Sequence, residues 1–390
     1  MPEPVDSRNP ERGGRAVWLD AARVTAACGI LLNHSSTDTA GDFFPQAETA
    51  DRVFPVVVKM VGEFTGTEFF ITVALFLLAS QLHRRGGGYA SVIGAQAKRL
   101  FVPFVFWTVF YAFYRLPKAY FYGYGDNIIH ELSQWQSWAS YFLLGTVQFH
   151  MHFFPTLFGI VLLYPVFEVA LFYPLAALAV LPLLYYKTNM DVWLYTYVHD
   201  PMSRDCLLRL VKVLTYGGYG LFAFGLFRFW RDGVPRPAAR KLALLAAFCL
   251  GVALISKLAM AAMIVQTGGF VNREGMFFYA YYSAPILVLL IFFGLQHSAW
   301  PTEFSRLARY GFGVLLVHPI FMDLYDILDL YARLDPPDYV IFKFLTALPL
   351  SLLLARAIAR TPALAWTIGL GEPPALRFPA LALPGRARGA

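Results

Sequence analysis

Charged side chains are scarce in this chain of 390 residues, of which only 15% are Asp, Glu, Lys or Arg and 58% are hydrophobic. A soluble globular protein carries about 25% charged residues, so this composition indicates a membrane protein. The formal net charge is nevertheless +7. In a membrane protein such an excess belongs to cytoplasmic loops, and we therefore expect the lipid bilayer as a partner and no nucleic acid.

Cysteine is scarce as well. The three cysteines are Cys28, Cys206 and Cys249, and two of them fall within apolar segments. Without a CxxC spacing or an obvious pairing, the sequence predicts neither a disulfide framework nor a metal site. It also lacks a glycine-rich phosphate loop after a strand, and a cleavable signal with a small-residue cleavage site. The first apolar segment is therefore the expected insertion signal, and we expect no permanently bound cofactor.

Long apolar runs are abundant, and about ten of them are long enough to cross a bilayer as helices. We predict an all-α, polytopic integral membrane protein whose membrane domain covers residues 16–360. Residues 1–15 are predicted to be a disordered cytoplasmic N-terminus and 361–390 an irregular cytoplasmic tail. The division of 137–186 into spans stays open. The expected spans are 17–36, 64–82, 100–115, 151–169, 171–186, 207–229, 242–265, 276–296, 310–328 and 339–359.

Basic residues alternate with acidic or mixed connections along the chain. If there are ten spans, all the basic clusters lie on one side of the membrane, which the positive-inside rule identifies as the cytoplasm. We therefore expect a bacterial-type inner membrane protein with both termini in the cytoplasm. The basic clusters lie within 8–15, 84–99, 228–241, 306–309 and 356–360.

The first span, WLDAARVTAACGILLNHSS, contains unusual polar residues. Ten residues separate Arg23 from His34. On a helix this spacing places the two side chains about 20° apart on one face and about 16 Å apart along the axis. Asp20 lies one turn before Arg23 on that face. With the predicted orientation, Arg23 lies near the inner membrane face and His34 near the outer face, and ionisable groups within a span are functional candidates.

Four stretches together resemble the acyltransferase-3 family of polytopic membrane acyltransferases. The first span matches the family signature of an Asp, then an Arg, then ten residues, then a His. One departure is that many members have Ser-Gly-Phe where this chain reads Ile71-Thr72-Val73-Ala74. The other three similar stretches are TEFFITVALFLLASQLHRR followed by AKRLFVPFVFW, HMHFFPTLFGIVLLYPVF, and LARYGFGVLLVHPIF.

The resemblance implies an acyl-CoA-dependent O-acyltransferase that modifies carbohydrates. Such an enzyme moves an acyl group, most often acetyl or succinyl, from cytoplasmic acyl-CoA as co-substrate to a hydroxyl of an extracytoplasmic glycan or glycolipid. A hydroxyl needs a base with a pKa near the working pH, which favours histidine. We therefore expect His34 to take the proton of the acceptor hydroxyl, either as a base in direct transfer or as an acyl carrier as well.

The remaining candidates are assigned around these two residues. Arg23 has a guanidinium suited to phosphate or carbonyl oxygens of the donor. Glu68 is expected to orient His34 or to balance its charge. Inner basic residues are candidates for the CoA phosphates, although the positive-inside rule explains them equally well. The CoA candidates are Arg23, Arg84, Arg85, Lys98 and Arg99, and the acceptor-binding candidates are Asp20, His152 and His318.

A transporter or flippase of a lipid-linked or sugar-like substrate is the alternative from another class. It predicts Gly- or Pro-interrupted helices in two similar halves and a coupling site near the membrane midplane. Here the polar residues are concentrated in the first span, which favours the enzyme. The acyl group, the acceptor and the oligomeric state stay open.

Overall fold

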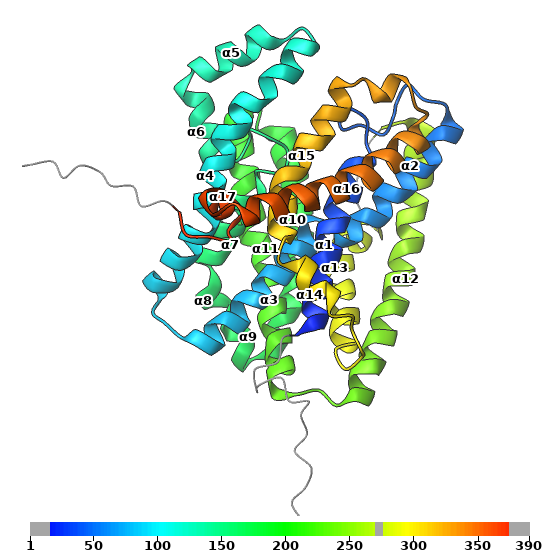
Figure 1. Cartoon of the computed structure of the whole chain (residues 1–390). Helices are drawn as coiled ribbons and strands as arrows, with labels where there is room; N and C mark the ends of the chain where they lie inside the picture. The colour runs from blue at the N-terminus through cyan, green and yellow to red at the C-terminus, as the bar shows by residue number, and fades with distance from the viewer. Residues whose placement is uncertain (1–15, 270–275, 374–390) are drawn as a thin grey trace, which may run out of the picture.

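The computed structural model describes residues 16–269 and 276–373, and within these ranges every regular element is a helix, as predicted (Figure 1). The predicted N-terminal segment 1–15 and the tail from residue 374 lie outside the described residues. The longer helices are α1 (Val17–Ser35), α2 (Thr49–Gly62), α3 (Thr67–Arg85), α4 (Tyr89–Phe121), α10 (Val180–Tyr197), α11 (Pro201–Asp232), α12 (Arg236–Thr267), α13 (Met276–Gly294), α15 (Gly311–Ile327) and α16 (Pro336–Arg360). The shorter elements are η2 (Glu63–Thr65), α5 (Gly125–Ser133), α6 (Trp135–Leu143), α7 (Phe153–Leu162), α8 (Tyr164–Phe167), α9 (Val169–Phe172), η3 (Pro174–Ala179), α14 (Glu303–Ala308), η4 (Leu330–Ala332), α17 (Pro362–Ala365) and η5 (Trp366–Ile368).

Several helices are long and apolar enough to cross a membrane. Among the described residues five segments qualify, and a sixth is counted if α7 and the segment α8–α9, which is bent relative to it, form one span. Each predicted span overlaps a helix, which confirms the all-α membrane class, while the number ten stays a prediction. The five segments are Thr49–Arg85, Tyr89–Phe121, Pro201–Asp232, Arg236–Thr267 and Pro336–Arg360.

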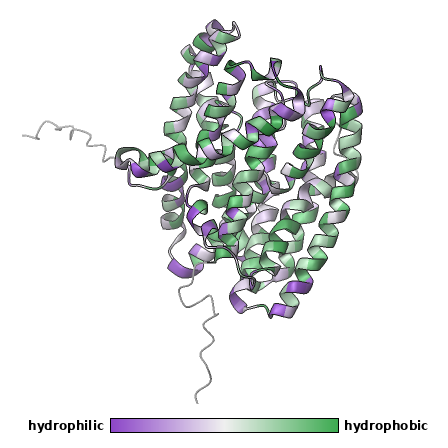
Figure 2. Ribbon diagram, turned by 45° about the vertical axis from the view of Figure 1, so that its right-hand side comes forward, coloured by the Kyte–Doolittle hydropathy of each residue, from purple (hydrophilic) through white to green (hydrophobic). Residues whose placement is uncertain are grey.

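The outer surface of the bundle is strongly apolar. On α12 the side chains of Leu244, Phe248 and Ile255 are exposed. Figure 2 shows that apolar residues cover most of the long helices. An exposed apolar surface of this extent is unfavourable in water and suits the hydrocarbon of a bilayer.

The ambiguous stretch 137–186 is divided by the loop between α6 and α7, a bend after α7 and a turn after α9. Helix α7 ends at Leu162, and the axis bends by 59° between α7 and the segment that starts at Tyr164. Pro165 has no N–H to donate to the carbonyl of Val161, so the α-helical ladder is interrupted there. After α9 the chain turns at Tyr173 and returns through η3 into α10.

Helix α1 lies inside the bundle rather than at its edge. It packs against α2, α3, α13, α14, α15 and α16 (Figure 1). At Gly29 a Cβ atom would lie only 2.6 Å from the carbonyl oxygen of Thr65, so the backbones of α1 and η2 approach closely. Because α1 is surrounded by protein, its polar side chains face other helices and not lipid.

Candidate active site

Arg23 is held in place by a chain of polar contacts near the first turn of α1. Its Nη1 atom donates to Oδ1 of Asp20 at 3.0 Å. The other carboxylate oxygen of Asp20 accepts a hydrogen bond of 2.7 Å from Ser305 on α14. Asp20 therefore links α1 to α14 and orients the guanidinium, and its role in binding the acceptor stays a prediction.

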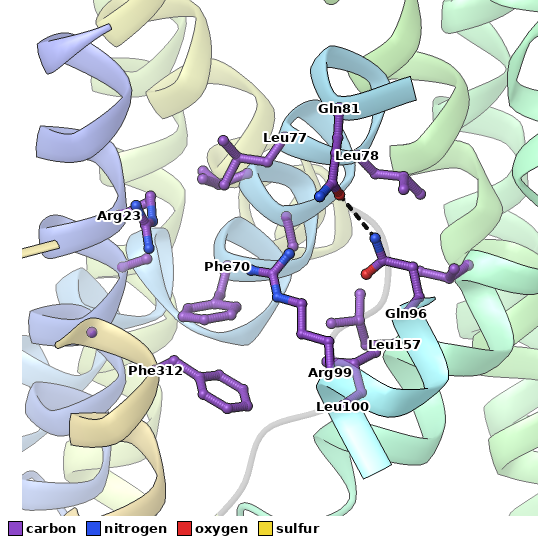
Figure 3. A pocket seen from close by; sticks show the side chains of 15 residues that line it. Arg23, Phe70, Leu77, Leu78, Gln81, Gln96, Arg99, Leu100, Leu157 and Phe312 are labelled. Atoms are coloured by element: carbon purple, nitrogen blue, oxygen red, sulfur yellow. Dashed lines mark hydrogen bonds between the residues drawn. The ribbon is translucent and has the colours of Figure 1, made fainter. Parts of the chain in front are cut away.

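Arg23 and Arg99 extend into the same cavity from α1 and α4 (Figure 3). The cavity contains about 770 Å³ of empty space, part of it open to solvent. A hydrogen bond of 2.9 Å from Gln96 to Gln81 lies on its wall. The other lining residues are apolar and come from α1, α3, α4, α7 and α15. The cavity thus combines two guanidinium groups with an apolar wall.

The other predicted CoA-binding residues lie outside this lining. Arg84, Arg85 and Lys98 are exposed. The Nε atom of Arg84 donates to the carbonyl of Ser80, and Lys98 forms an ion pair of 2.7 Å with Glu372. Of the predicted donor-binding set, the structure therefore brings Arg23 and Arg99 to one cavity and leaves the other three outside its lining.

The far end of α1 carries His34 into a cluster of aromatic rings. The ring of His34 lies 4.4 Å from that of Phe149 and is stacked on that of His318 at 5.6 Å, both measured between centroids. The ring of His150 lies 5.2 Å from that of His318. Three imidazoles from α1, α15 and the loop between α6 and α7 therefore meet, and we call His34, His150 and His318 the histidine cluster.

A close helix contact explains why His34 meets His318. A Cβ atom on Gly311 would lie 4.0 Å from that of Ala27 and 3.9 Å from the carbonyl oxygen of Arg23. His34 follows Ala27 by seven residues, and His318 follows Gly311 by seven. Since seven residues are about two helical turns, two helices that run side by side in the same direction keep the two histidines opposite each other.

His152 contacts the backbone of its own loop. Its Nδ1 atom lies 2.6 Å from the carbonyl oxygen of Phe149, and the cations nearest to it are Lys212 and Arg209 of α11. In the sequence His150-Met151-His152 two histidines lie two positions apart, which is a signal that could identify His150. The sequence-based prediction includes only His152.

Glu68 accepts a hydrogen bond of 2.6 Å from the hydroxyl of Tyr216 on α11. Among the described residues, no hydrogen bond or ion pair joins Glu68 to His34. The structure therefore brings His34 together with His318 but does not bring it to Glu68.

Buried and half-buried ionic groups surround the C-terminal end of α1, and none of them is among the predicted site residues. Lys59 donates to Oδ1 of Asn33 at 2.9 Å, and Lys343 lies 3.5 Å from the carbonyl oxygen of Thr37. Lys118 forms ion pairs with Asp323 at 2.8 Å and with Asp326 at 2.6 Å. Ionisable residues within apolar helices were the available signal. In the part of the chain that the structure describes, no group of His, Cys, Asp and Glu is arranged to hold a metal ion.

Comparison with known proteins identifies the family. Neither curated proteins nor solved structures give a match to this chain. A family model described as an acyltransferase domain matches residues 16–356. This range includes Arg23, the cavity and the whole histidine cluster. The chain is therefore an acyltransferase and belongs to the acyltransferase-3 family.

Proposed function

We propose that the protein moves an acyl group, acetyl or succinyl, from cytoplasmic acyl-CoA to a hydroxyl of an extracytoplasmic glycan or glycolipid. One observation supports this proposal most strongly. A single helix, α1, presents Arg23 to a cavity near one end and His34 to the histidine cluster near the other. The proposed location is the inner membrane, with both termini in the cytoplasm and the Arg23 end of α1 facing inward.

The cavity suits the donor. The guanidinium groups of Arg23 and Arg99 offer donors only, which fits the phosphate oxygens of CoA or its thioester carbonyl. The apolar wall, which includes Leu77, Leu157 and Phe312, fits the pantetheine arm and a short acyl chain. The exposed Arg84, Arg85 and Lys98 are left for the outermost phosphates of CoA.

His34 supplies the proton transfer. As the acceptor oxygen bonds to the acyl carbon, the hydroxyl proton moves to a neutral imidazole nitrogen of His34, and the thioester bond breaks to release the CoA thiolate. The thiolate then takes up a proton to leave as the free thiol. In the variant of this route with an acyl-enzyme, a ring nitrogen of His34 first attacks the thioester and the CoA thiolate leaves. The acceptor hydroxyl then attacks the acyl-imidazole, forms the ester and releases the imidazole.

Purified protein in liposomes with labelled acetyl-CoA or succinyl-CoA and a mixed sugar panel tests the proposal. We expect wild type to bind acyl-CoA and release free CoA, Arg23→Ala to lose binding, and His34→Ala to bind but turn over at least about 100-fold more slowly. His130→Gln, at an exposed position on α5, is the control.

Failure of wild type to bind or consume either acyl-CoA would contradict the proposal. Substrate counterflow in vesicles without acyl-CoA would then favour the transporter alternative. Full turnover by His34→Ala would leave an acyltransferase whose catalytic base lies elsewhere.

A further inference from the structure

Three buried nitrogen atoms near His34 have no hydrogen-bond partner among the residues that the structure describes. They are both ring nitrogens of His150 and Nε2 of His318. His150 is 3% exposed and His318 is fully buried. Buried polar atoms in native proteins are nearly always hydrogen bonded, so three in one cluster indicate a place where a polar ligand binds.

Hydrogen-bond roles in the histidine cluster restrict the chemistry of that ligand. The Nδ1 atom of His318 lies 2.9 Å from the carbonyl oxygen of Leu315. Because a carbonyl oxygen only accepts, Nδ1 of His318 must carry the proton, and Nε2 is left as an acceptor in the neutral ring. The neutral ring of His150 adds one donor and one acceptor. The two rings together offer one donor and two acceptors.

This combination fits hydroxyl groups better than an anion. An anionic group accepts hydrogen bonds only, so it would leave the two acceptor nitrogens without partners. A hydroxyl both donates and accepts, so one hydroxyl can donate to Nε2 of His318 and accept from the N–H of His150 at the same time. The ring of Phe149, which is 42% exposed and contacts the rings of His34 and His318, offers a flat apolar face beside them. A sugar ring carries hydroxyl groups at its edge and an apolar C–H face, so it can hydrogen bond to the histidines while its face packs on Phe149.

We propose that His150 and His318 bind a hydroxyl of the acceptor adjacent to the hydroxyl that reacts at His34. The second hydroxyl donates to Nε2 of His318 and accepts from the N–H of His150. The rings of His34 and His318 are stacked with their centroids 5.6 Å apart, so hydroxyls on neighbouring carbons of one sugar can each reach one of the two rings. The acceptor class is thus a glycan with two adjacent free hydroxyls, which rests on the proposed function and narrows it.

Matched acceptors test this proposal on the wild-type protein. Methyl glycosides of common hexoses are compared with their deoxy analogues, each lacking one hydroxyl, by measuring kcat/KM for acyl transfer from labelled acetyl-CoA. A site built to bind a hydroxyl discriminates strongly against the analogue that lacks it. We expect one deoxy position next to the acylated hydroxyl to lower kcat/KM by at least about 100-fold. Equal rates with and without every adjacent hydroxyl would overturn the proposal.

The variant His318→Asn separates a binding role from a structural one. The Asn amide keeps a donor for the carbonyl of Leu315 but lacks the acceptor at the position of Nε2. We expect the variant to react more slowly than wild type with the intact acceptor, but as fast as wild type with the sensitive deoxy analogue. The ratio of kcat/KM between the two acceptors should therefore fall from about 100-fold to a few-fold. Slower reaction with both acceptors at an unchanged ratio would show a structural role and overturn the proposal. His130→Gln, an exposed histidine on α5, should keep the wild-type ratio.

These outcomes are distinguishable from failure of the proposed function. If wild type transfers acyl groups but ignores adjacent hydroxyls, only the present inference is wrong. If wild type consumes no acyl-CoA with any glycoside, the acyl-CoA reaction itself is wrong and the inference fails with it.

Discussion

The two ends of α1 differ in the kind of group they can bind. Following the proposed orientation, we call the Arg23 end the inner end and the His34 end the outer end. The inner end opens into a cavity where Arg23 and Arg99 offer hydrogen-bond donors within an apolar wall. The outer end carries His34 into closely packed rings, where neutral imidazoles offer mainly acceptors. The first environment suits a phosphorylated thioester and the second suits hydroxyls. One helix therefore separates two incompatible binding chemistries by about 16 Å, close to half the hydrocarbon thickness.

The two ends also differ in whether their basic side chains are buried in ion pairs or exposed. Near the outer end, Lys257 on α12 pairs with the carboxylate of Glu63 in η2, and Lys118 on α4 pairs with Asp323 and Asp326 on α15. Basic residues at the inner end instead remain exposed, as with Arg84 and Lys98. Structural stability should therefore depend on ion pairs at the outer end and much less on those at the inner surface.

The largest effect is expected from breaking the buried pair at the outer end. Lys257→Met leaves the carboxylate of Glu63 buried without this partner and should lower the free energy of unfolding by about 3–5 kcal/mol. The double variant Glu63→Leu/Lys257→Met should recover most of this loss. Thermal unfolding in detergent, followed by tryptophan fluorescence, measures both. A single variant as stable as wild type would contradict the comparison.

Next in size is the effect of Arg99 on the donor. Removal of a charge-assisted hydrogen bond costs about 1.5–3 kcal/mol, so Arg99→Leu should raise KM for acyl-CoA by about 10- to 100-fold. The value of kcat should change by only a few-fold, because the histidine cluster is not touched. Steady-state kinetics at saturating acceptor measure both constants. Arg240→Ala, an exposed inner residue of α12, is the control, and an equal rise in KM there would contradict a specific role for Arg99.

A change in the middle of α1 tests the helix that joins the two ends. Gly29→Ala would place a Cβ atom 2.6 Å from the carbonyl oxygen of Thr65, so α1 and η2 must separate. We expect a loss of about 1–3 kcal/mol in stability, measured by thermal unfolding. Gly251→Ala on the exposed face of α12 has open space and should instead be neutral or slightly stabilising. Identical unfolding of the two variants would contradict the close packing of α1.

The smallest effect is expected at the inner surface. The ion pair between Lys98 and Glu372 has side chains that are 58% and 86% exposed. Solvent screens such a pair, so Glu372→Gln should change the stability by less than about 0.5 kcal/mol. Salt at about 0.5 M reduces the electrostatic screening length to a few ångströms. The unfolding curves of Glu372→Gln and wild type should overlap both with and without this salt. A large destabilisation would show that the inner surface also depends on ion pairs.

The placement of Arg23 and His34 could be predicted because both lie on one regular helix, where spacing alone determines their separation. The partners of these residues could not be predicted in the same way. Glu68 bonds to Tyr216, which lies 148 residues further along the chain, and no local pattern connects the two. The orientation of His150 and His152 depends on a loop in which Gly145 has a φ of +71° and packs against the backbone of His152. Only tertiary structure determines which of the two histidines joins the cluster.

The contact of α1 with α15 has a consequence for biosynthesis. Ala27 and Gly311 lie close together, although 283 residues separate them in the sequence. During translation α1 is completed early, and His34 then has to wait in the membrane until the segment containing His318 has been inserted. The stacked pair cannot exist in any shorter nascent chain. Catalytic competence is therefore a late event of membrane insertion, and α1 needs temporary contacts for its polar groups until α15 arrives.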